Sequence, residues 1–249
     1  MSAEFTPAEF TDDALLDGRV IVRQPVEGYR AAIDPVLLAA AARPDSTTKV
    51  LDAGCGSGAA MFCLAARCPA VRITGFERNP QSAAFARDGI ALNKFGDRID
   101  VIEGDLARLP AVFRDAFDMV ITNPPFGADG TAAPDPGRAA ANHESNLDLA
   151  GWVAASFACL KPKGRLVIIH RGDRVSELLG ELRKAAGDLR ILPVHARQYD
   201  AARRVIVDAG KGRRTPDTLL PALVMHDVDG FYTTAAQAVL RDADALPMG

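Results

Sequence analysis

The sequence predicts an α/β protein built on a doubly wound, mostly parallel sheet. Short, nearly continuous apolar runs rich in β-formers alternate with longer segments of helical spacing. Strands that are apolar throughout are typical of sheets covered on both faces. The chain has 249 residues and 48% hydrophobic content, enough for one substantial core, and no Pro/Gly/Ser linker divides it. Ligands of such sheets bind at the carboxyl ends of the strands.

The alternation places each predicted element in turn. Buried strands are predicted at Lys49–Ala53, Val71–Phe76, Ile99–Glu103, Phe117–Thr122 and Arg165–His170. Helices are predicted at Ala59–Arg67, Pro80–Asn93, Leu147–Leu160 and Val175–Ala186. Pro80 suits a first helical turn, where its missing N–H is not needed. An earlier helix, Pro35–Ala42, either covers the ligand site or packs as a plain amphipathic helix.

The rhythm changes after residue 187. Arg190–His195 and Arg203–Ala209 resemble strands, and the loop between them is too short for a crossover helix. We therefore expect an antiparallel pair at the edge of the sheet, with Leu219–His226 extending it and a closing helix at Thr233–Arg241. Residues 1–45 are expected to form an N-terminal extension with the ligand-side helix, and residues 46–249 the main domain.

A glycine-rich turn follows the first predicted strand. In Asp52-Ala53-Gly54-Cys55-Gly56-Ser57-Gly58, the glycines permit a tight turn and close approach of a ligand to the next helix. A nucleotide-like cofactor is implied. Gly54, Gly56 and Ala59 also fit the dinucleotide-binding pattern of dehydrogenases, so this motif leaves dehydrogenase and methyltransferase both open.

Two carboxylates follow the next two strands. Glu77 ends the second strand, where it can accept hydrogen bonds from both hydroxyls of an adenosine ribose, or serve as a helix N-terminal charge. Asp105 follows the third strand, where it can accept from the adenine amine of the cofactor, or cap the segment after it.

The fourth strand ends in Asn123-Pro124-Pro125-Phe126. The prolines hold carbonyl oxygens rigidly, so the Asn123 amide oxygen and the Pro124 carbonyl can accept both hydrogens of one planar amine. The Phe126 ring supplies a stacking face. A nitrogen methylase needs such a cradle, whereas a dehydrogenase does not.

These motifs, in this order, resemble those of class I S-adenosylmethionine-dependent N-methyltransferases. The match is closer to the bacterial family that methylates N6 of adenine 37, beside the anticodon of a valine tRNA. It rests on further segments, from about residue 14 to 240: Gly18–Val20, Gly28–Arg30, Asp34–Ala40, Arg203–Val207, Lys211–Gly212 and Leu223–His226. Members often have tyrosine where this chain has Phe126, which keeps the stacking face but removes a hydroxyl.

The resemblance implies a Rossmann-like, seven-stranded sheet and S-adenosylmethionine as the cofactor. It implies cofactor-binding roles for Asp52, Gly54, Gly56, Gly58, Glu77, Asp105 and Asn123. Asn123, Pro124 and Phe126 are then the expected catalytic residues, and no metal is needed.

Charge is distributed unevenly along the chain. Residues 1–150 carry 14 Lys/Arg and 21 Asp/Glu, net −7, and residues 151–249 carry 15 and 11, net +4. Arg203, Arg204 and Lys211 are candidate contacts to an RNA backbone, although a charge run alone favours a solvated face. The polar loop 127–146, with Arg138, follows the fourth strand and is a candidate to close over the base.

Several functional classes are excluded or left as rivals. The amino terminus lacks a targeting pattern and no apolar run is long enough to span a membrane, so we expect a cytoplasmic protein, with a monomer favoured. Four cysteines without metal-ligand spacing predict buried thiols. The rivals are methylation of an rRNA base or a protein glutamine, and a non-catalytic RNA-binding protein with a methylase fold.

Overall fold

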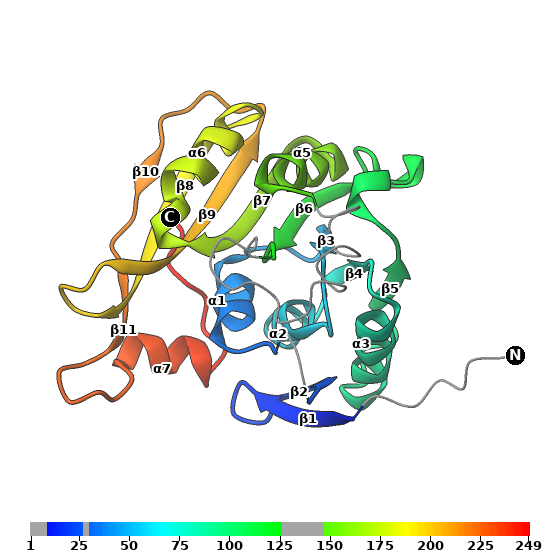
Figure 1. The fold of residues 1–249 in the computed structure, drawn as a ribbon, viewed down its shortest axis with the longest axis horizontal. Coiled ribbons are helices and arrows are strands. Elements are labelled where there is room, and N and C mark those ends of the chain that lie inside the picture. The colour runs from blue at the N-terminus through cyan, green and yellow to red at the C-terminus, as the bar shows by residue number, and fades with distance from the viewer. Residues whose placement is uncertain (1–8, 27–29, 126–146) are drawn as a thin grey trace, which may run out of the picture.

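A mixed β-sheet forms the centre of the computed structural model, which describes residues 9–26, 30–125 and 147–249 (Figure 1). In these ranges the sheet has nine strands: eight follow the order β10-β8-β9-β7-β6-β3-β4-β5, and the ninth, β11, also pairs with β8. The strands are β3 (Lys49–Ala53), β4 (Arg72–Glu77), β5 (Ile99–Glu103), β6 (Phe117–Thr122), β7 (Leu160–Arg171), β8 (Ala186–Arg197), β9 (Ala202–Lys211), β10 (Thr218–Leu219) and β11 (Leu223–His226). Only β9 runs antiparallel to its neighbours within the described sheet. The other strands therefore end at one common edge.

Helices cover both faces of the sheet, as a doubly wound fold requires (Figure 1). One face packs against α1 (Ile33–Ala41), α2 (Ala59–Arg67), α3 (Pro80–Leu92) and α7 (Thr234–Leu240). The other face packs against α5 (Leu149–Cys159) and α6 (Val175–Arg183). Single turns of 3₁₀ helix occur at η1 (Leu106–Arg108), η2 (Ala111–Phe113) and η3 (Gly172–Arg174). No helix within the described ranges has the length and apolar character to cross a membrane.

The predicted alternation of strands and helices is confirmed, and local sequence explains the helix starts. Asn79 accepts hydrogen bonds from the backbone of Gln81 and Ser82, which caps α3, and Pro80 fills its first turn. Asp148 caps α5 through the Gly151 N–H in the same way. These two caps set where each helix begins relative to the strand before it.

Two expectations about the sheet need correction. The described part of the sheet has nine strands, because β10 and β11 extend it beyond seven. The antiparallel strand is not at the edge, since β9 lies between β7 and β8. Its residues Val205–Gly210 are buried without alternation, which is the pattern of an interior strand.

A two-stranded hairpin precedes the sheet and was not predicted. It consists of β1 (Phe10–Leu15) and β2 (Val20–Pro25). Val20 and Val22 are fully buried in the core that α1, α2 and α3 share. The Asn93 side chain at the end of α3 accepts from the Ile21 N–H at 2.8 Å and donates to its carbonyl at 2.6 Å. The hairpin and α1 therefore share one apolar core with the strands that follow.

Candidate active site

Strand register brings the predicted motifs together at the carboxyl edge. Asp52 on β3 pairs with Ile121 on β6, so Gly54 and Asn123, each two residues further on, leave the sheet at the same level. Ala53 pairs with Phe76 on β4, which places Gly54 beside Glu77 on the other side. The site is therefore built by the ends of three neighbouring strands.

The glycine-rich turn adopts the backbone that the sequence predicts. Gly54, Gly56 and Gly58 have φ of +73°, +55° and +93°, a region that favours glycine. The Gly54 N–H donates to the Phe76 carbonyl at 2.8 Å, and the Gly56 N–H donates to Glu77 Oε2 at 2.8 Å. The Cys55 N–H also donates to the Phe76 carbonyl at 3.3 Å, so three hydrogen bonds tie the turn to the end of β4.

The Glu77 carboxylate binds both the glycine-rich turn and the residue that caps α3. Besides Gly56, its second oxygen accepts from the Asn79 N–H at 2.7 Å. The residue remains partly exposed, and each carboxylate oxygen has a further lone pair. Glu77 therefore combines the helix-end role that the sequence allowed with free acceptor capacity for a hydroxyl pair.

Asp52 is buried beneath the turn, with only 2% of its surface exposed. Its Oδ2 accepts from the Met61 N–H in the first turn of α2 at 3.1 Å. Burial raises the pKa of this carboxyl to about 7, and the charge of Glu77 raises the pKa further, against the effect of the Met61 N–H. The Asp52 carboxylate therefore links the end of β3 to the first turn of α2.

Asp105 follows β5 at the same edge, since Glu103 pairs with Glu77. Its Oδ1 accepts from the Ala107 N–H at 2.9 Å and so caps η1, the alternative that the sequence left open. Gly104 lies against the Phe76 ring, and an added Cβ would stand 2.4 Å from that ring. The carboxylate is thereby fixed beside the end of β4.

Asn123 and Pro124 end β6 as predicted. Asn123 is partly buried and its Oδ1 is shielded from solvent. Pro124 is buried, while Pro125 is exposed. A shielded acceptor interacts more strongly with a donor than one in water. The predictions for Phe126, Arg138 and the rest of loop 127–146 fall outside the described residues.

Trp152 on α5 links the ends of β6 and β3. This role was not predicted from the sequence. The Trp152 Nε1–H donates to Thr122 Oγ1 at 2.8 Å, and that hydroxyl donates to the Ala53 carbonyl at 2.7 Å. Its ring lies against Gly54, where a Cβ would stand 2.7 Å from Cζ2. The one signal in the sequence was that this is the only tryptophan of the chain.

The basic residues predicted to contact RNA lie at the two opposite ends of β9. Arg203 and Arg204 begin β9 at the carboxyl edge, where Arg204 pairs with Arg171, the last residue of β7. Lys211 ends the same strand at the opposite edge, where its ammonium bonds to Asp115 at 2.8 Å and to the Leu160 carbonyl. Arg203 and Arg204 therefore do not form one continuous basic surface with Lys211, because the length of β9 separates them.

Arg30 and Asp34 each bind a different part of the structure. The Arg30 guanidinium contacts Asp13 and Thr11 of the hairpin. Asp34, in the first turn of α1, accepts from Arg204 Nε at 2.8 Å. Residues Asp34–Ala41 are buried, so α1 is a packing helix that the ion pair anchors to β9.

Comparison with known proteins identifies the family. The model of the methyltransferase small domain matches residues 33–195. The chain belongs to the methyltransferase small domain family. It is an S-adenosylmethionine-dependent methyltransferase.

Curated relatives span most of the methyltransferase. A Porphyromonas gingivalis protein named tRNA1(Val) (adenine(37)-N6)-methyltransferase is 31% identical over 220 residues, covering 82% of this chain and 84% of the relative. Proteins of the same name from Shewanella amazonensis (30% identity, 86% and 91% covered) and Musicola paradisiaca (28% identity, 94% and 90% covered) are also similar. The resemblance stated from the motifs is thus confirmed.

Solved structures share the fold of the methyltransferase. A predicted O-methyltransferase, Atu636 from Agrobacterium tumefaciens, superimposes with a TM-score of 0.71 at 28% identity, covering 85% of this chain and 97% of that one. M. jannaschii TYW2 in complex with AdoMet gives a TM-score of 0.58 at 17% identity, with 86% and 90% covered. The class I methyltransferase fold is therefore confirmed.

Proposed function

We propose that the methyltransferase transfers a methyl group to the exocyclic N6 of an adenine in RNA, and that the target is a tRNA adenine next to the anticodon. The observation that carries this proposal is the Asn123–Pro124 pair at the end of β6, level with Gly54 of the cofactor turn. The names of the relatives at about 30% identity support the same target.

The donor arrangement of the target nitrogen explains why two acceptors are needed. The N6 lone pair is delocalised into the adenine ring, so the nitrogen is a poor nucleophile while planar. Asn123 Oδ1 and the Pro124 carbonyl each accept one N6 hydrogen and favour a pyramidal nitrogen. Holding the amine in this orientation supplies most of the rate enhancement, because the acceptors are fixed before the base arrives.

Bound S-adenosylmethionine supplies an electrophilic methyl group on a sulfonium. The Gly54–Gly58 turn, Glu77 and Asp105 would hold it, and glycine at position 54 allows the positive φ of the turn and its close packing against the Trp152 ring. The methylated nitrogen is acidic enough to release a proton to water. No dedicated base is therefore required beside Asn123.

An adenine reaches this cradle only when it is turned out of its stack. Arg203 and Arg204 at the same edge are suited to the phosphates on either side of the turned-out base. Phe126 is the expected stacking partner of the base, and Arg138 is an expected backbone contact. We infer a cytoplasmic enzyme that acts as a monomer.

Two other acceptors, a hydroxyl and a glutamine amide, are chemically weaker candidates. A hydroxyl, the acceptor that the name of the Agrobacterium O-methyltransferase implies for that protein, has one hydrogen and leaves one of the two acceptors idle. A glutamine amide suits both acceptors but has little use for arginines at this edge. An rRNA base remains a rival of the same chemistry, and a non-catalytic RNA-binding role would make the cofactor turn idle.

The deciding experiment incubates the purified protein with labelled S-adenosylmethionine and either total tRNA, rRNA or a release-factor peptide containing glutamine. Digestion to nucleosides or amino acids and mass analysis then identify the product. We expect N6-methyladenosine from tRNA alone. Methylglutamine, or label only in rRNA, would replace the proposed target, and cofactor binding without label in any acceptor would favour a scaffold.

A further inference from the structure

The turn between β8 and β9 presents a tyrosine in an unfavourable conformation. Tyr199 is 94% exposed and has φ of +73°. The Asp200 N–H donates to the Arg197 carbonyl at 3.2 Å, so Tyr199 is the third residue of a four-residue turn. Glycine or asparagine normally fills that position when φ is positive. A bulky ring there is strained and exposed to water, which points to a use beyond folding.

Hydrogen bonds hold the turn, so the backbone that carries the Tyr199 ring has a defined position. His195 Nδ1 lies 2.6 Å from the Asp200 carbonyl, which ties the end of β8 to the far side of the turn. β9 begins at Ala202 and pairs with both β8 and β7. A rigid support lowers the entropy lost when a partner binds to the ring.

Tyr199 lies on the side of the sheet where β6 and β3 end at the active site. β8 and β7 both run antiparallel to β9, so β8 ends at the same edge as β7 and β6. Arg171, Arg204 and Val194 are level with one another across β7, β9 and β8. Three strand spacings of about 4.8 Å separate β8 from β6. Thr122 is level with Ile191, so β8 continues several residues beyond the level of Asn123 before it ends at Arg197. At about 3.3 Å per residue along the strand, Tyr199 lies on the order of 20 Å from Asn123, a span of several nucleotides.

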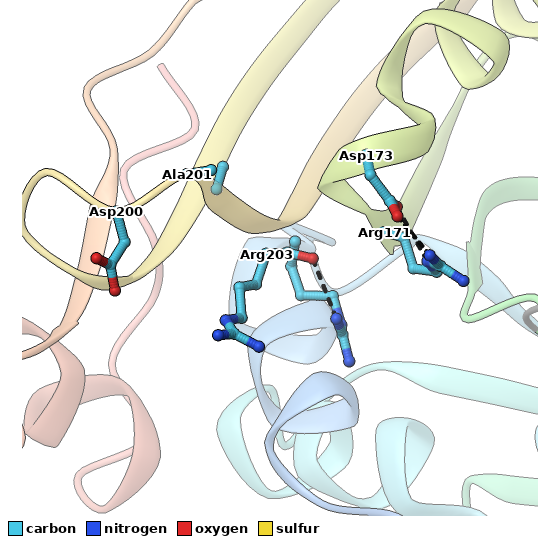
Figure 2. Close-up of a pocket in the computed structure, with 7 residues that line it drawn as sticks. Arg171, Asp173, Asp200, Ala201 and Arg203 are labelled. Atoms are coloured by element: carbon cyan, nitrogen blue, oxygen red, sulfur yellow. Dashed lines mark hydrogen bonds and ion pairs between the residues drawn. The ribbon is translucent and has the colours of Figure 1, made fainter. Parts of the chain in front are cut away.

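An arginine-lined cleft lies between the tyrosine turn and β7. It has a volume of about 530 Å³ and is lined by Arg171, Asp173, Asp200, Ala201, Ala202, Arg203 and Arg204. Figure 2 shows Arg203 between Asp200 on the turn and the Arg171–Asp173 ion pair. Arg203 is exposed at the start of β9. Tyr199 thus directly precedes the residues that form one wall of a cleft suited to phosphate.

We propose that the Tyr199 ring stacks on an unpaired base of the RNA that lies several nucleotides from the target adenine, while a phosphate next to that base enters the arginine cleft. Bases stack on aromatic rings irrespective of their hydrogen-bonding edges, and RNA loops offer unpaired bases for this contact. The proposal rests on the RNA methyltransferase function proposed above and assigns a second RNA contact to the enzyme.

A second exposed ring provides a matched control. Phe231 is 70% exposed on the turn after β11, and β11 lies beside β8 with His226 paired to Arg197. Asp227 Oδ1 accepts from the N–H groups of Asp229 and Phe231, so that turn is also fixed. The turn that bears Phe231 contains Asp227 and Asp229 and no arginine, whereas Arg203 and Arg204 follow shortly after Tyr199. A general loss of exposed aromatic surface would affect both rings, whereas base stacking at Tyr199 would not involve Phe231.

The test measures binding of a fluorescein-labelled, unmodified valine tRNA transcript by anisotropy in the presence of S-adenosylhomocysteine. For Tyr199→Gly we expect roughly 5- to 150-fold weaker binding, the range for loss of one stacked base. The melting temperature should rise or stay unchanged, because glycine suits the positive φ. Tyr199→Phe and Phe231→Ser should bind as the wild type does.

Abasic substitutions locate the stacked base. Each unpaired nucleotide of the loop that contains the target adenine is replaced in turn by an abasic residue, and the effect of Tyr199→Gly is measured again. At one position the effect should vanish, because the ring has lost its partner. Wild-type affinity for Tyr199→Gly, equal losses for Tyr199→Gly and Phe231→Ser, or no coupled position would overturn the inference and leave the methylation proposal intact. If the wild-type protein bound no RNA, both proposals would fall.

Discussion

The Trp152 indole donates a hydrogen bond to the Thr122 hydroxyl at 2.8 Å and so links α5 to the residue that immediately precedes Asn123. The hydroxyl in turn donates to the Ala53 carbonyl at 2.7 Å, one residue before Gly54. One side chain therefore joins the end of the acceptor strand to the start of the cofactor turn. We expect the spacing between the methyl donor and the target amine to depend on this link.

Removing the Thr122 hydroxyl should test the link. Thr122→Val keeps the shape but leaves the buried indole N–H and the Ala53 carbonyl without this partner, at a cost of about 1–3 kcal/mol in the free energy of unfolding. We expect kcat to fall about 10- to 100-fold as Asn123 shifts. Urea unfolding and steady-state assays measure both. Thr122→Ser retains the hydroxyl and should keep most of the activity, so equal kcat values for the two variants would refute this role.

Gly54 is constrained by both its backbone and its neighbour. Gly54→Ala places a Cβ in a left-handed conformation 2.7 Å from the Trp152 ring. Either the turn or the indole must move, and we expect affinity for S-adenosylmethionine to fall more than about tenfold, or ~1.4 kcal/mol. Isothermal titration calorimetry measures the change. Gly212→Ala, with φ of +65° and open space around it, controls for backbone strain alone and should leave affinity unchanged.

Much of this site was predictable because parallel strands end together. Gly54, Glu77 and Asn123 each follow an apolar run, and any parallel sheet brings such residues to one edge. The role of Trp152 was not predictable, since its helical spacing fits packing equally well and its partner lies thirty residues away. The split between Arg203 and Lys211 depends on the direction of β9, which sequence distance alone does not show.

Asn123→Ala should separate catalysis from cofactor binding. The amide oxygen matters most when the target nitrogen becomes pyramidal, so kcat should fall about 10²- to 10³-fold, as for other removed transition-state contacts. Affinity for S-adenosylmethionine should change less than about threefold. Single-turnover assays and calorimetry give the two quantities. Matching losses in both would assign Asn123 to holding the cofactor.

Asp52 should make the stability of the cofactor-free protein depend on pH. Its pKa of about 7 in the folded state exceeds the ordinary value of 3.8, so the folded state binds a proton more tightly. The stability that this provides is fully present below pH 3.8 and is lost as pH rises through 7, by up to about 4 kcal/mol. In Asp52→Asn this loss should be absent. Thermal melts of both proteins at pH 5 and pH 8 measure it, and an unchanged difference between the two proteins would refute buried ionisation at this position.

The two ends of β9 should respond differently to loss of charge. Arg203 lies at the carboxyl edge beside the active site, whereas Lys211 lies at the opposite edge and bonds to Asp115. Arg203→Ala should weaken binding of an unmodified tRNA transcript and lower the slope of log K against log salt by about 1, the effect of one lost phosphate contact. Lys211→Ala should change neither quantity, although it should lower stability slightly through loss of its contacts. Anisotropy titrations between about 50 and 200 mM salt measure the slopes. If Lys211→Ala lowered the slope as much as Arg203→Ala, the RNA would have to reach both edges of the sheet, and an RNA path confined to the carboxyl edge would be wrong.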